Sequence, residues 1–530
     1  MKIYHNVHIF APDHPGAAAM AVEGGEILAL SSNEQILDSF PAAEAIDLGG
    51  RTIWPGLTDA HVHLQHLAES IAMVDCETDT LEECLDRIAA AAQTAPDSAW
   101  IRGHGWNHNV WANGYGTVEQ LDRVCEGHPA FLTAKSLHAA WVNSEALALA
   151  GITKATPNPA SGLIQRNADG RPTGILLEND AIQLVKSHIP KSATDEVEAQ
   201  IKALQPHLWQ RGLTGLHDFD GKACWLALKS LHASGDLKLR ILKNIPREDA
   251  AVFYDAGLTT YAGDDWLHIG GVKLFADGAL GPQTGAMLAP YNGTENTGQL
   301  LLSEEQLISL GKEALDHGLA LTIHAIGDRA NRIVLDAYEE LRRYETGQSL
   351  PHYPHRIEHV QIIDPQDLPR LAELGIVASV QPIHALSDMV MADNYLGQRA
   401  RFAYAYRSLQ ENGATLVFGS DAPVESVNPF LGLAAAVTRR RQSGDPGPSG
   451  WQPQERVSLQ TALISFSQTP AQIAGRDYLG RLAQGCKADF IILENDPFLA
   501  PTMEIANLKP SATIINGECV YRQPGFSLDL

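Results

Sequence analysis

The pair His61 and His63 lies in the stretch GLTDAHVHL, where an apolar run gives way to polar residues. Side chains alternate along a β-strand, so both imidazoles face one way and Val62 faces the other. Imidazole is the commonest metal ligand in proteins and a common proton carrier near neutral pH. Two imidazoles on one face at the end of a strand are therefore suited to hold a metal ion.

Three further residues interrupt apolar runs at the corresponding ends of later predicted strands. His324 lies in LALTIHAIGD, His359 in HRIEHVQII and Asp421 in ATLVFGSDAPV. Nitrogen ligands with carboxylate support and open positions suit a borderline divalent ion, most often Zn²⁺. Such an ion lowers the pKa of bound water towards about 7, which gives a hydroxide nucleophile at neutral pH. We expect Asp421 to accept a proton from that water and to pass it to the leaving group.

Lys273, in GGVKLFADG, is flanked by apolar strand residues. A lysine in such surroundings must lose its charge, find a partner or be chemically converted. One interpretation is an alkyl stem that carries the ammonium to the barrel rim. The other is a carbamate formed with CO₂, which turns the ammonium into a carboxylate that bridges two metal ions. The pattern leaves both open.

The elements that position these residues alternate short apolar runs with amphipathic stretches. Near-continuous apolar runs that turn polar at their C-terminal ends are typical of parallel strands buried on both faces. Eight such runs predict an α/β fold with a TIM-like (β/α)8 barrel, in which active sites lie at the C-terminal strand ends. The runs are 52–54 continuing into GLTDAHVH, 212–219, 237–245, 268–278, 319–328, 355–363, 375–384 and 414–424.

Two parts of the chain lie outside the barrel. Residues 70–205 separate the first and second strands by far more than a βα loop needs, and we predict an inserted domain over the active-site mouth. Residues 1–52 and 480–530 alternate apolar and polar side chains, but neither half is long enough for a stable sheet. We expect the chain ends to pair into one small β domain, which leaves 53–69 and 206–479 for the barrel.

The composition excludes several classes of protein. The 530 residues include 39 Lys and Arg against 63 Asp and Glu, a net charge of −24, which argues against binding to phosphate backbones. No apolar run approaches the ~20 residues that span a bilayer, and MKIYHNVHIF lacks the apolar core of a signal peptide. We expect a cytoplasmic protein with a small-molecule substrate and no nucleic-acid or membrane partner; the sequence allows a homodimer.

An ordered series of motifs covers essentially the whole chain. It comprises DLGGRTIWPGLTDAHVHL, SLHAAWVNSEAL, DGRPTGILLE, VKLFADGALG, TIHAIGDRA, RIEHVQ, SVQPIH, FGSDAPV and LAQGCKADFIILENDPF. The series resembles the metal-dependent amidohydrolase superfamily, and within it the YtcJ-like branch (amidohydrolase family 3), which includes N-substituted formamide deformylases. The resemblance implies a distorted (β/α)8 barrel, a composite β-sandwich from both chain ends, and a centre of one or two metal ions.

The resemblance also assigns roles to the residues that match the motifs. Lys273 falls where such proteins place a bridging carboxylated lysine, and Asp421 where they place the metal-bound general base. By the same matching, one ion is held by His61 and His63 and the other by His324 and His359.

Four further residues are expected to contact substrate. His138, in SLHAAWVNSEAL, matches a motif histidine of this branch, with a packed loop histidine as the alternative, and His384 lies in QPIH. Trp106, from the insertion, suggests an aromatic pocket wall. Gln283 follows Pro282 where many relatives have a Ser-Arg pair, and loss of that arginine removes a fixed donor for a substrate carboxylate.

The sequence therefore predicts a hydrolase that acts on a non-peptide carbon–nitrogen bond of an amide, a formamide or a cyclic amide. Attack by metal-bound hydroxide, with Asp421 as the proton carrier, is the expected mechanism. An esterase or lactonase with the same centre is the alternative enzyme. A barrel that only binds or acts as a scaffold would have lost metal ligands, whereas every proposed ligand position is filled here.

Overall fold

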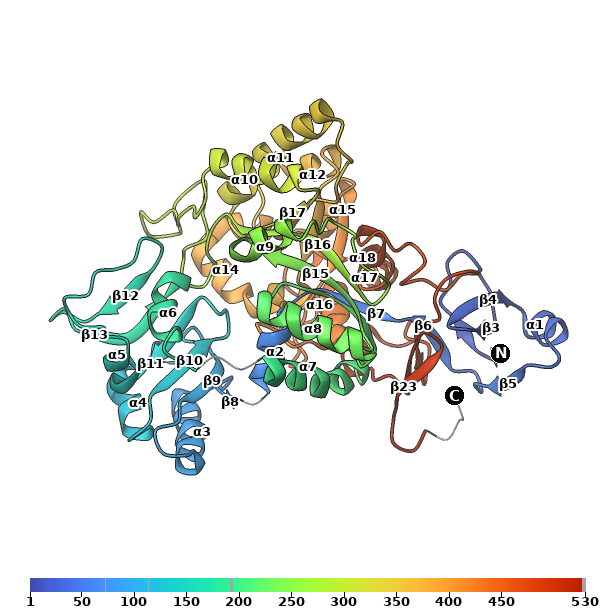
Figure 1. Cartoon of the computed structure of the whole chain (residues 1–530), viewed down its shortest axis with the longest axis horizontal. Helices are drawn as coiled ribbons and strands as arrows, with labels where there is room; N and C mark the ends of the chain where they lie inside the picture. The colour runs from blue at the N-terminus through green and yellow to red at the C-terminus, as the bar shows by residue number, and fades with distance from the viewer. Residues whose placement is uncertain (72, 113, 191–193, 527–530) are drawn as a thin grey trace.

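The centre of the molecule is an eight-stranded parallel sheet, curved into a nearly closed barrel (Figure 1). The structure, a computed structural model, describes residues 1–71, 73–112, 114–190 and 194–526. The eight strands overlap the eight predicted runs and follow one another around the barrel in chain order, which confirms the TIM-like fold. They are β7 (Leu57–Val62), β14 (Leu213–Asp218), β15 (Arg240–Pro246), β16 (Leu267–Phe275), β17 (Ala320–Ala325), β18 (Arg356–His359), β19 (Val377–Val380) and β20 (Thr415–Phe418).

The prediction for the start of the first barrel strand was wrong. The run at 52–54 does not continue into the barrel but forms β6 (Thr52–Pro55), which pairs antiparallel with β21 (Phe490–Leu493) in another sheet. Gly56 makes the step between the two sheets. A Cβ at this position would lie 2.3 Å from Thr214 Oγ1, so only glycine lets the chain pass this close to β14.

The barrel closes between β20 and β7 through one backbone bridge and the side chain of Asp59. An isolated parallel bridge joins Val62 and Ala422. Beside it, the buried carboxylate of Asp59 accepts hydrogen bonds from the Ser420 backbone N–H at 2.9 Å and from the Ser420 hydroxyl at 2.5 Å. Asp59 thereby fixes the end of β20 against the end of β7, where two of the predicted site residues lie.

Helices cover the outside of the barrel. One of them, α10 (Glu304–Asp316), begins with a capping box: Ser303 Oγ accepts from Gln306 N–H, and the Gln306 side chain accepts from Ser303 N–H. The barrel helices are α2 (Leu64–Ser70), α7 (Thr194–Trp209), α8 (Lys222–Ser234), α9 (Ala250–Asp255), α10 (Glu304–Asp316), α11 (Asp328–Gln348), α12 (Leu368–Glu373), α13 (Pro382–Ser387), α14 (Met389–Leu396), α15 (Tyr406–Glu411), α16 (Pro429–Thr438), α17 (Leu459–Ser465) and α18 (Gln468–Ile473).

The segment between α2 and α7 has its own six-stranded sheet, at one end of the long axis of the molecule (Figure 1). In sheet order its strands are β12 (Leu163–Arg166), β13 (Pro172–Leu177), β11 (Ala139–Val142), β10 (Ala130–Ala134), β9 (Ile101–Trp106) and β8 (Val74–Asp75). Its helices are α3 (Leu81–Thr94), α4 (Val118–Val124), α5 (Ser144–Leu149) and α6 (Glu178–Lys186). We refer to this segment as the insertion.

The two chain ends meet at the opposite end of the molecule (Figure 1). A five-stranded sheet combines β2 (His8–Ile9) and β6 with β21, β22 (Ala512–Ile515) and β23 (Glu518–Arg522). Beside α1 (Asn33–Ser39) lies a second sheet with the order β4 (Glu26–Ser31), β3 (Ala19–Glu23), β1 (Lys2–His5) and β5 (Glu44–Asp47). The expected pairing of the chain ends is confirmed. Within the described residues, none of the helices is long and apolar enough to cross a lipid bilayer.

Candidate metal centre and active site

A cavity of about 640 Å³ lies at the C-terminal ends of the barrel strands, between the barrel and the insertion. Its volume falls in the range of about 300–1,000 Å³ that is typical of small-molecule sites. The barrel strands bring all the residues predicted to bind metal to this cavity. These are His61, His63, Lys273, His324, His359 and Asp421.

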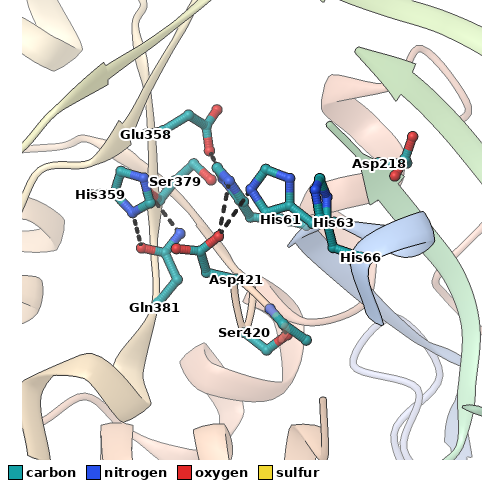
Figure 2. A network of polar contacts seen from close by, with 12 residues as sticks. His61, His63, His66, Asp218, Glu358, His359, Ser379, Gln381, Ser420 and Asp421 are labelled. Carbon is teal, nitrogen blue, oxygen red and sulfur yellow. Dashed lines mark hydrogen bonds and ion pairs between the residues drawn. The ribbon is translucent and has the colours of Figure 1, made fainter. Parts of the chain in front are cut away.

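Asp421 is the point on which the first two histidines converge (Figure 2). Its Oδ1 lies 3.4 Å from His61 Nε2 and 3.4 Å from His63 Nε2. One ligand atom from each of His61, His359 and Asp421 lies within 4.8 Å of the other two. Atoms this close are able to contact one cation.

Nδ1 of each of these three histidines lies against an oxygen acceptor, as Figure 2 shows for His61 and His359. Nδ1 of His61 lies 2.6 Å from Glu358 Oε2, and Nδ1 of His359 lies 2.8 Å from Gln381 Oε1. Nδ1 of His63 lies 3.1 Å from Asp220 Oδ1. Because these oxygens accept from Nδ1, Nε2 is the nitrogen of each ring that is left to face a cation, which is the arrangement that orients metal-binding imidazoles.

His324 is oriented the other way round. Its ring centroid lies 4.7 Å from that of His359, and its Nε2 donates to the Gly278 carbonyl oxygen at 2.9 Å. The lone pair of the neutral ring is therefore on Nδ1. Burial holds the pKa of His324 well below its usual range, and the nearby charge of Lys273 lowers it further. This imidazole is neutral, as a metal ligand must be.

The electrostatics of the cluster favour a positive charge at its centre. Burial lowers the pKa of His61 to about 4, so this ring is neutral. Burial also lowers the pKa of His63, but hydrogen bonds and charges from Asp220 and Asp421 outweigh it and raise the value to about 10. Burial raises the pKa of Asp421, yet its histidine neighbours hold it well below the usual range. The carboxylate is thus ionised.

The two strand-end residues that complete the cluster have unusual backbones. His359 has a φ of 77° and Asp421 a φ of 60°, both in the left-handed region that favours glycine. Such conformations cost roughly 1–2 kcal/mol each and persist where the surrounding structure enforces them. Here the Asp421 N–H donates to the His61 carbonyl oxygen at 2.7 Å. The strained turn directs the carboxylate to the histidines.

Lys273 is a buried amine whose Nζ has no hydrogen-bond partner among the described residues. It lies 4.7 Å from the ring centroid of Phe219 and 4.9 Å from that of Phe275. Burial lowers its pKa to about 8. The adjacent strand carries a second buried lysine, Lys243, but its Nζ donates to Asp218 Oδ2 at 2.6 Å. The structure therefore separates a satisfied lysine from an unsatisfied one.

Three of the four residues predicted to contact substrate line the cavity. His138 comes from the insertion, with its Nδ1 2.8 Å from Glu178 Oε2, and His384 comes from α13. Trp106 also borders the cavity but is only 1% exposed, and its indole N–H donates to the Leu132 carbonyl oxygen. Gln283 is not brought to the cavity, whereas the neighbouring Pro282 lines it.

The sequence reasoning missed the residues that orient the cluster. Asp220, Glu358 and Gln381 each lie at or just beyond the end of a barrel strand, and this was the signal that could have found them. Asp59 has no such local signal. His66 lies one helical turn beyond His63, with its Nδ1 2.6 Å from Asp220 Oδ1 and its Nε2 3.4 Å from Lys186 Nζ of the insertion.

These residues fit a divalent metal ion. Their donor set suits a borderline cation such as Zn²⁺. It contains the neutral imidazoles of His61, His324 and His359, the imidazole of His63, an ionised carboxylate and a buried amine with no partner among the described residues. The nearby cavity leaves room for a substrate beside them. The arrangement is that of a hydrolytic metal site.

Comparisons with known proteins agree with this chemistry. The model of the amidohydrolase family matches residues 44–521. YtcJ of Bacillus subtilis (strain 168) is 31% identical, over 98% of this chain and 99% of that protein. An N-substituted formamide deformylase of Arthrobacter pascens is 29% identical, over 99% and 98% respectively. The crystal structure of an uncharacterized metal-dependent hydrolase from Pyrococcus horikoshii OT3 is 27% identical, covers 94% of this chain and 99% of that chain, and has a TM-score of 0.77.

The family match spans most of the chain, and one relative exceeds 30% identity over nearly its full length. Both confirm the resemblance that the motifs indicated. The chain belongs to the amidohydrolase family and is a hydrolytic enzyme.

Proposed function

We propose that this enzyme is a metal-dependent hydrolase of a non-peptide carbon–nitrogen bond in a small molecule. The observation that carries the proposal is the convergence of His61 Nε2 and His63 Nε2 on Asp421 Oδ1 at the cavity. A divalent ion, for which we propose zinc, supplies Lewis-acid activation of water and of a carbonyl group. The residues that would hold one or two such ions are His61, His63, Lys273, His324, His359 and Asp421.

Asp421 is the proton carrier of the proposed reaction. One oxygen, Oδ1, faces the histidines, while Oδ2 lies 3.9 Å from His384 Nε2 at the cavity wall. The ionised carboxylate takes a proton from the attacking water and delivers it to the departing nitrogen. An amine is a poor leaving group unless it is protonated, so a carboxylate at this position supports cleavage of a carbon–nitrogen bond.

Lys273 is proposed to act as a carbamate. Because its pKa is lowered to about 8, part of the amine is neutral near physiological pH. The neutral nitrogen bonds to the carbon of CO₂ and loses one proton, which gives an anionic group with two oxygen ligands. Among the described residues, the Lys273 amine has no hydrogen-bond partner and lies over the Phe219 ring. This supports the role, because a carbamate at the same place would have the bound cations as partners.

The cavity supports a small substrate that carries no carboxylate. Pro282 and Gln283 stand where many relatives have a Ser-Arg pair, so neutral Gln283 takes the place of the arginine, and Pro282 lines the wall. The cationic side chain of Arg102, which also lines the cavity, donates to Glu69 Oε2 at 2.8 Å. Lys135 is similarly engaged by Glu77 and Glu425. This pairing favours a neutral amide or formamide beside Arg102 and Lys135, while Lys186 and Arg247 also line the cavity.

The first experiment measures metal content and activation. The protein is purified without chelators and its bound metals are counted by elemental analysis. We expect about one or two divalent ions per chain and recovery of activity when Zn²⁺ or Mn²⁺ is added to a chelator-treated sample. Near-zero metal with no activation would contradict the proposal.

The second experiment compares leaving groups. N-substituted formamides, acetamides and cyclic amides are assayed beside esters and lactones of the same carbon skeleton. A higher kcat/KM for the amides supports carbon–nitrogen hydrolysis. A higher value for the esters would assign the same centre to an esterase or lactonase.

A further inference from the structure

His384 carries a buried nitrogen that the proposed reaction has not used. The residue is 6% exposed and lines the cavity from α13, the helix that follows β19. Its Nε2 has no hydrogen-bond partner among the residues that the structure describes. Leaving a buried polar group unpaired costs roughly 1–3 kcal/mol, and most such groups in native proteins are satisfied. A group left unpaired beside a substrate cavity points to a bond that the substrate completes.

The neighbouring side chain of Gln361 defines which kind of bond this is. Gln361 Nε2 donates to His384 Nδ1 at 3.4 Å, so Nδ1 is the acceptor of the ring. The hydrogen of the neutral imidazole is therefore on Nε2. His384 presents an N–H donor to the cavity. This arrangement is the reverse of that of the neutral rings of His61 and His359, which present lone pairs.

The donor lies beside the proposed proton carrier without being bonded to it. His384 Nε2 is 3.9 Å from Asp421 Oδ2, beyond hydrogen-bond distance. The ring is stacked over that of His359, with centroids 6.1 Å apart and an interplanar angle of 16°. In the proposed reaction, the water that gives its proton to Asp421 attacks a carbonyl carbon close to Asp421 Oδ2. The carbonyl oxygen, one bond from that carbon, then lies near His384 Nε2. Donors aimed at such an oxygen stabilise the charge that develops on it.

We infer that His384 Nε2–H donates a hydrogen bond to the carbonyl oxygen of the substrate and stabilises the negative charge that forms there. Gln361 is the positioning residue that keeps the hydrogen on Nε2. The inference rests on the proposed function, because it requires hydrolysis at a carbonyl group. It adds His384 to the proposed catalytic residues and assigns a positioning role to Gln361.

The test uses two variants of similar size at the same position in the metal-loaded enzyme. His384→Gln keeps an N–H near the position of Nε2, whereas His384→Leu fills the space without a donor. We expect His384→Leu to lower kcat by about 10²–10³-fold with little change in KM, as for other oxyanion donors. The kcat of His384→Gln should be at least tenfold higher than that of His384→Leu. Metal content and Tm should match the wild type in both variants, because His384 is not among the proposed ligands.

A second substrate separates direct contact from an effect through Asp421. The sulfur of a thioformamide is a weaker hydrogen-bond acceptor than the oxygen of the matching formamide. The kcat loss in His384→Leu should therefore be several-fold smaller for the thioformamide. Gln361→Leu should lower kcat less than His384→Leu, and the double variant should be no worse than His384→Leu alone.

Three kinetic results would overturn the inference while leaving the proposed function intact. They are equal kcat values for His384→Leu and His384→Gln, a change confined to KM, and an equal loss for formamide and thioformamide. Loss of bound metal in His384→Leu would likewise overturn it by assigning the residue to the metal centre. A wild-type enzyme that hydrolyses neither amides nor esters would instead contradict the proposed function itself, and the inference with it.

Discussion

At the scale of single residues, the two oxygens of Asp421 have different surroundings. Oδ1 faces two imidazole nitrogens at 3.4 Å, and Oδ2 faces the cavity wall at His384. The carboxylate is ionised although it is only 7% exposed, because its neighbours lower its pKa more than burial raises it. It is thus an ionised acceptor at the position where the proposed reaction moves a proton.

Replacing this acceptor tests the proton transfer. Asp421→Asn retains one oxygen towards the histidines but removes the base. We expect kcat for amide hydrolysis to fall by about 10²–10⁴-fold, the usual contribution of a positioned general acid or base. Elemental analysis of the same sample serves as the control, because a loss that merely follows loss of metal would not test this role. An unchanged kcat would contradict it.

The two buried lysines at the cavity end of the barrel give a second prediction. Lys273 has no partner among the described residues, whereas Lys243 is bonded to Asp218. Lys273→Ala should lose metal and activity, and short carboxylic acids should restore part of both by replacing the carbamate. Lys243→Ala should instead lower Tm, because it leaves Asp218 buried without its cation, and the acids should not rescue it. Full activity of Lys273→Ala would contradict the carbamate.

At the scale of elements, the barrel strands bring the site residues together at one edge and leave other polar residues in the core. His268 lies near the start of β16 and is 3% exposed, and neither ring nitrogen has a hydrogen-bond partner among the described residues. Burial, reinforced by the charge of Arg476, lowers its pKa to about 3. The folded protein therefore favours the neutral form of this ring.

The sign of the pH dependence follows from that value. The unfolded chain binds a proton at His268 near pH 6.5, the folded chain only near pH 3, so stability falls as the pH drops through this window. His268→Phe removes the titration and keeps the ring shape. Between pH 7 and pH 5, its free energy of unfolding should gain about 2 kcal/mol relative to the wild type. Calorimetry at both pH values measures the difference in free energy of unfolding between the variant and the wild type. The same difference at pH 7 and pH 5 would contradict the prediction. As a control, the difference should not change between pH 8 and pH 7.

At the scale of the whole molecule, a buried ion pair joins the barrel to the sheet built from the two chain ends. Arg240, at the start of β15, donates to both oxygens of Asp489 at 2.9 and 3.0 Å. Asp489 also accepts from Asn516 N–H at 2.7 Å, and the Arg240 guanidinium stacks 4.1 Å from the Trp266 ring centroid. This contact is at the end of the barrel away from the cavity.

Breaking this pair should affect stability and not chemistry. Asp489→Ala leaves a buried guanidinium without its anion, which typically costs about 3–5 kcal/mol. We expect a lower Tm, while kcat measured well below the transition stays at the wild-type value. A double variant, Arg240→Met with Asp489→Leu, should be more stable than the single variant because no charge is left unpaired. A single variant as stable as the wild type would show that the pair does not hold the two parts together.

Much of the site was predictable from particular residues. His61 and His63 alternate with Val62 along a strand. The other three, His324, His359 and Asp421, interrupt apolar runs, so the local sequence marks each of these positions as a strand end. The orienting partners were harder to find. Their role depends on which strands become neighbours, as for Asp59 and Ser420, which are 361 residues apart. Gln283 shows the converse, because its place in a motif did not bring it to the cavity.

The sequence by itself determined the barrel and the residue types at its edge, because strand periodicity and the change from apolar to polar are local properties of the chain. Only the tertiary structure decided what each group does there. Among the residues that the structure describes, it left Lys273 without a partner while pairing Lys243. It also gave His384 a hydrogen on Nε2 while His359 presents a lone pair. Protonation and tautomer depend on burial and on the atom opposite each nitrogen, and those atoms come from strands distant in sequence.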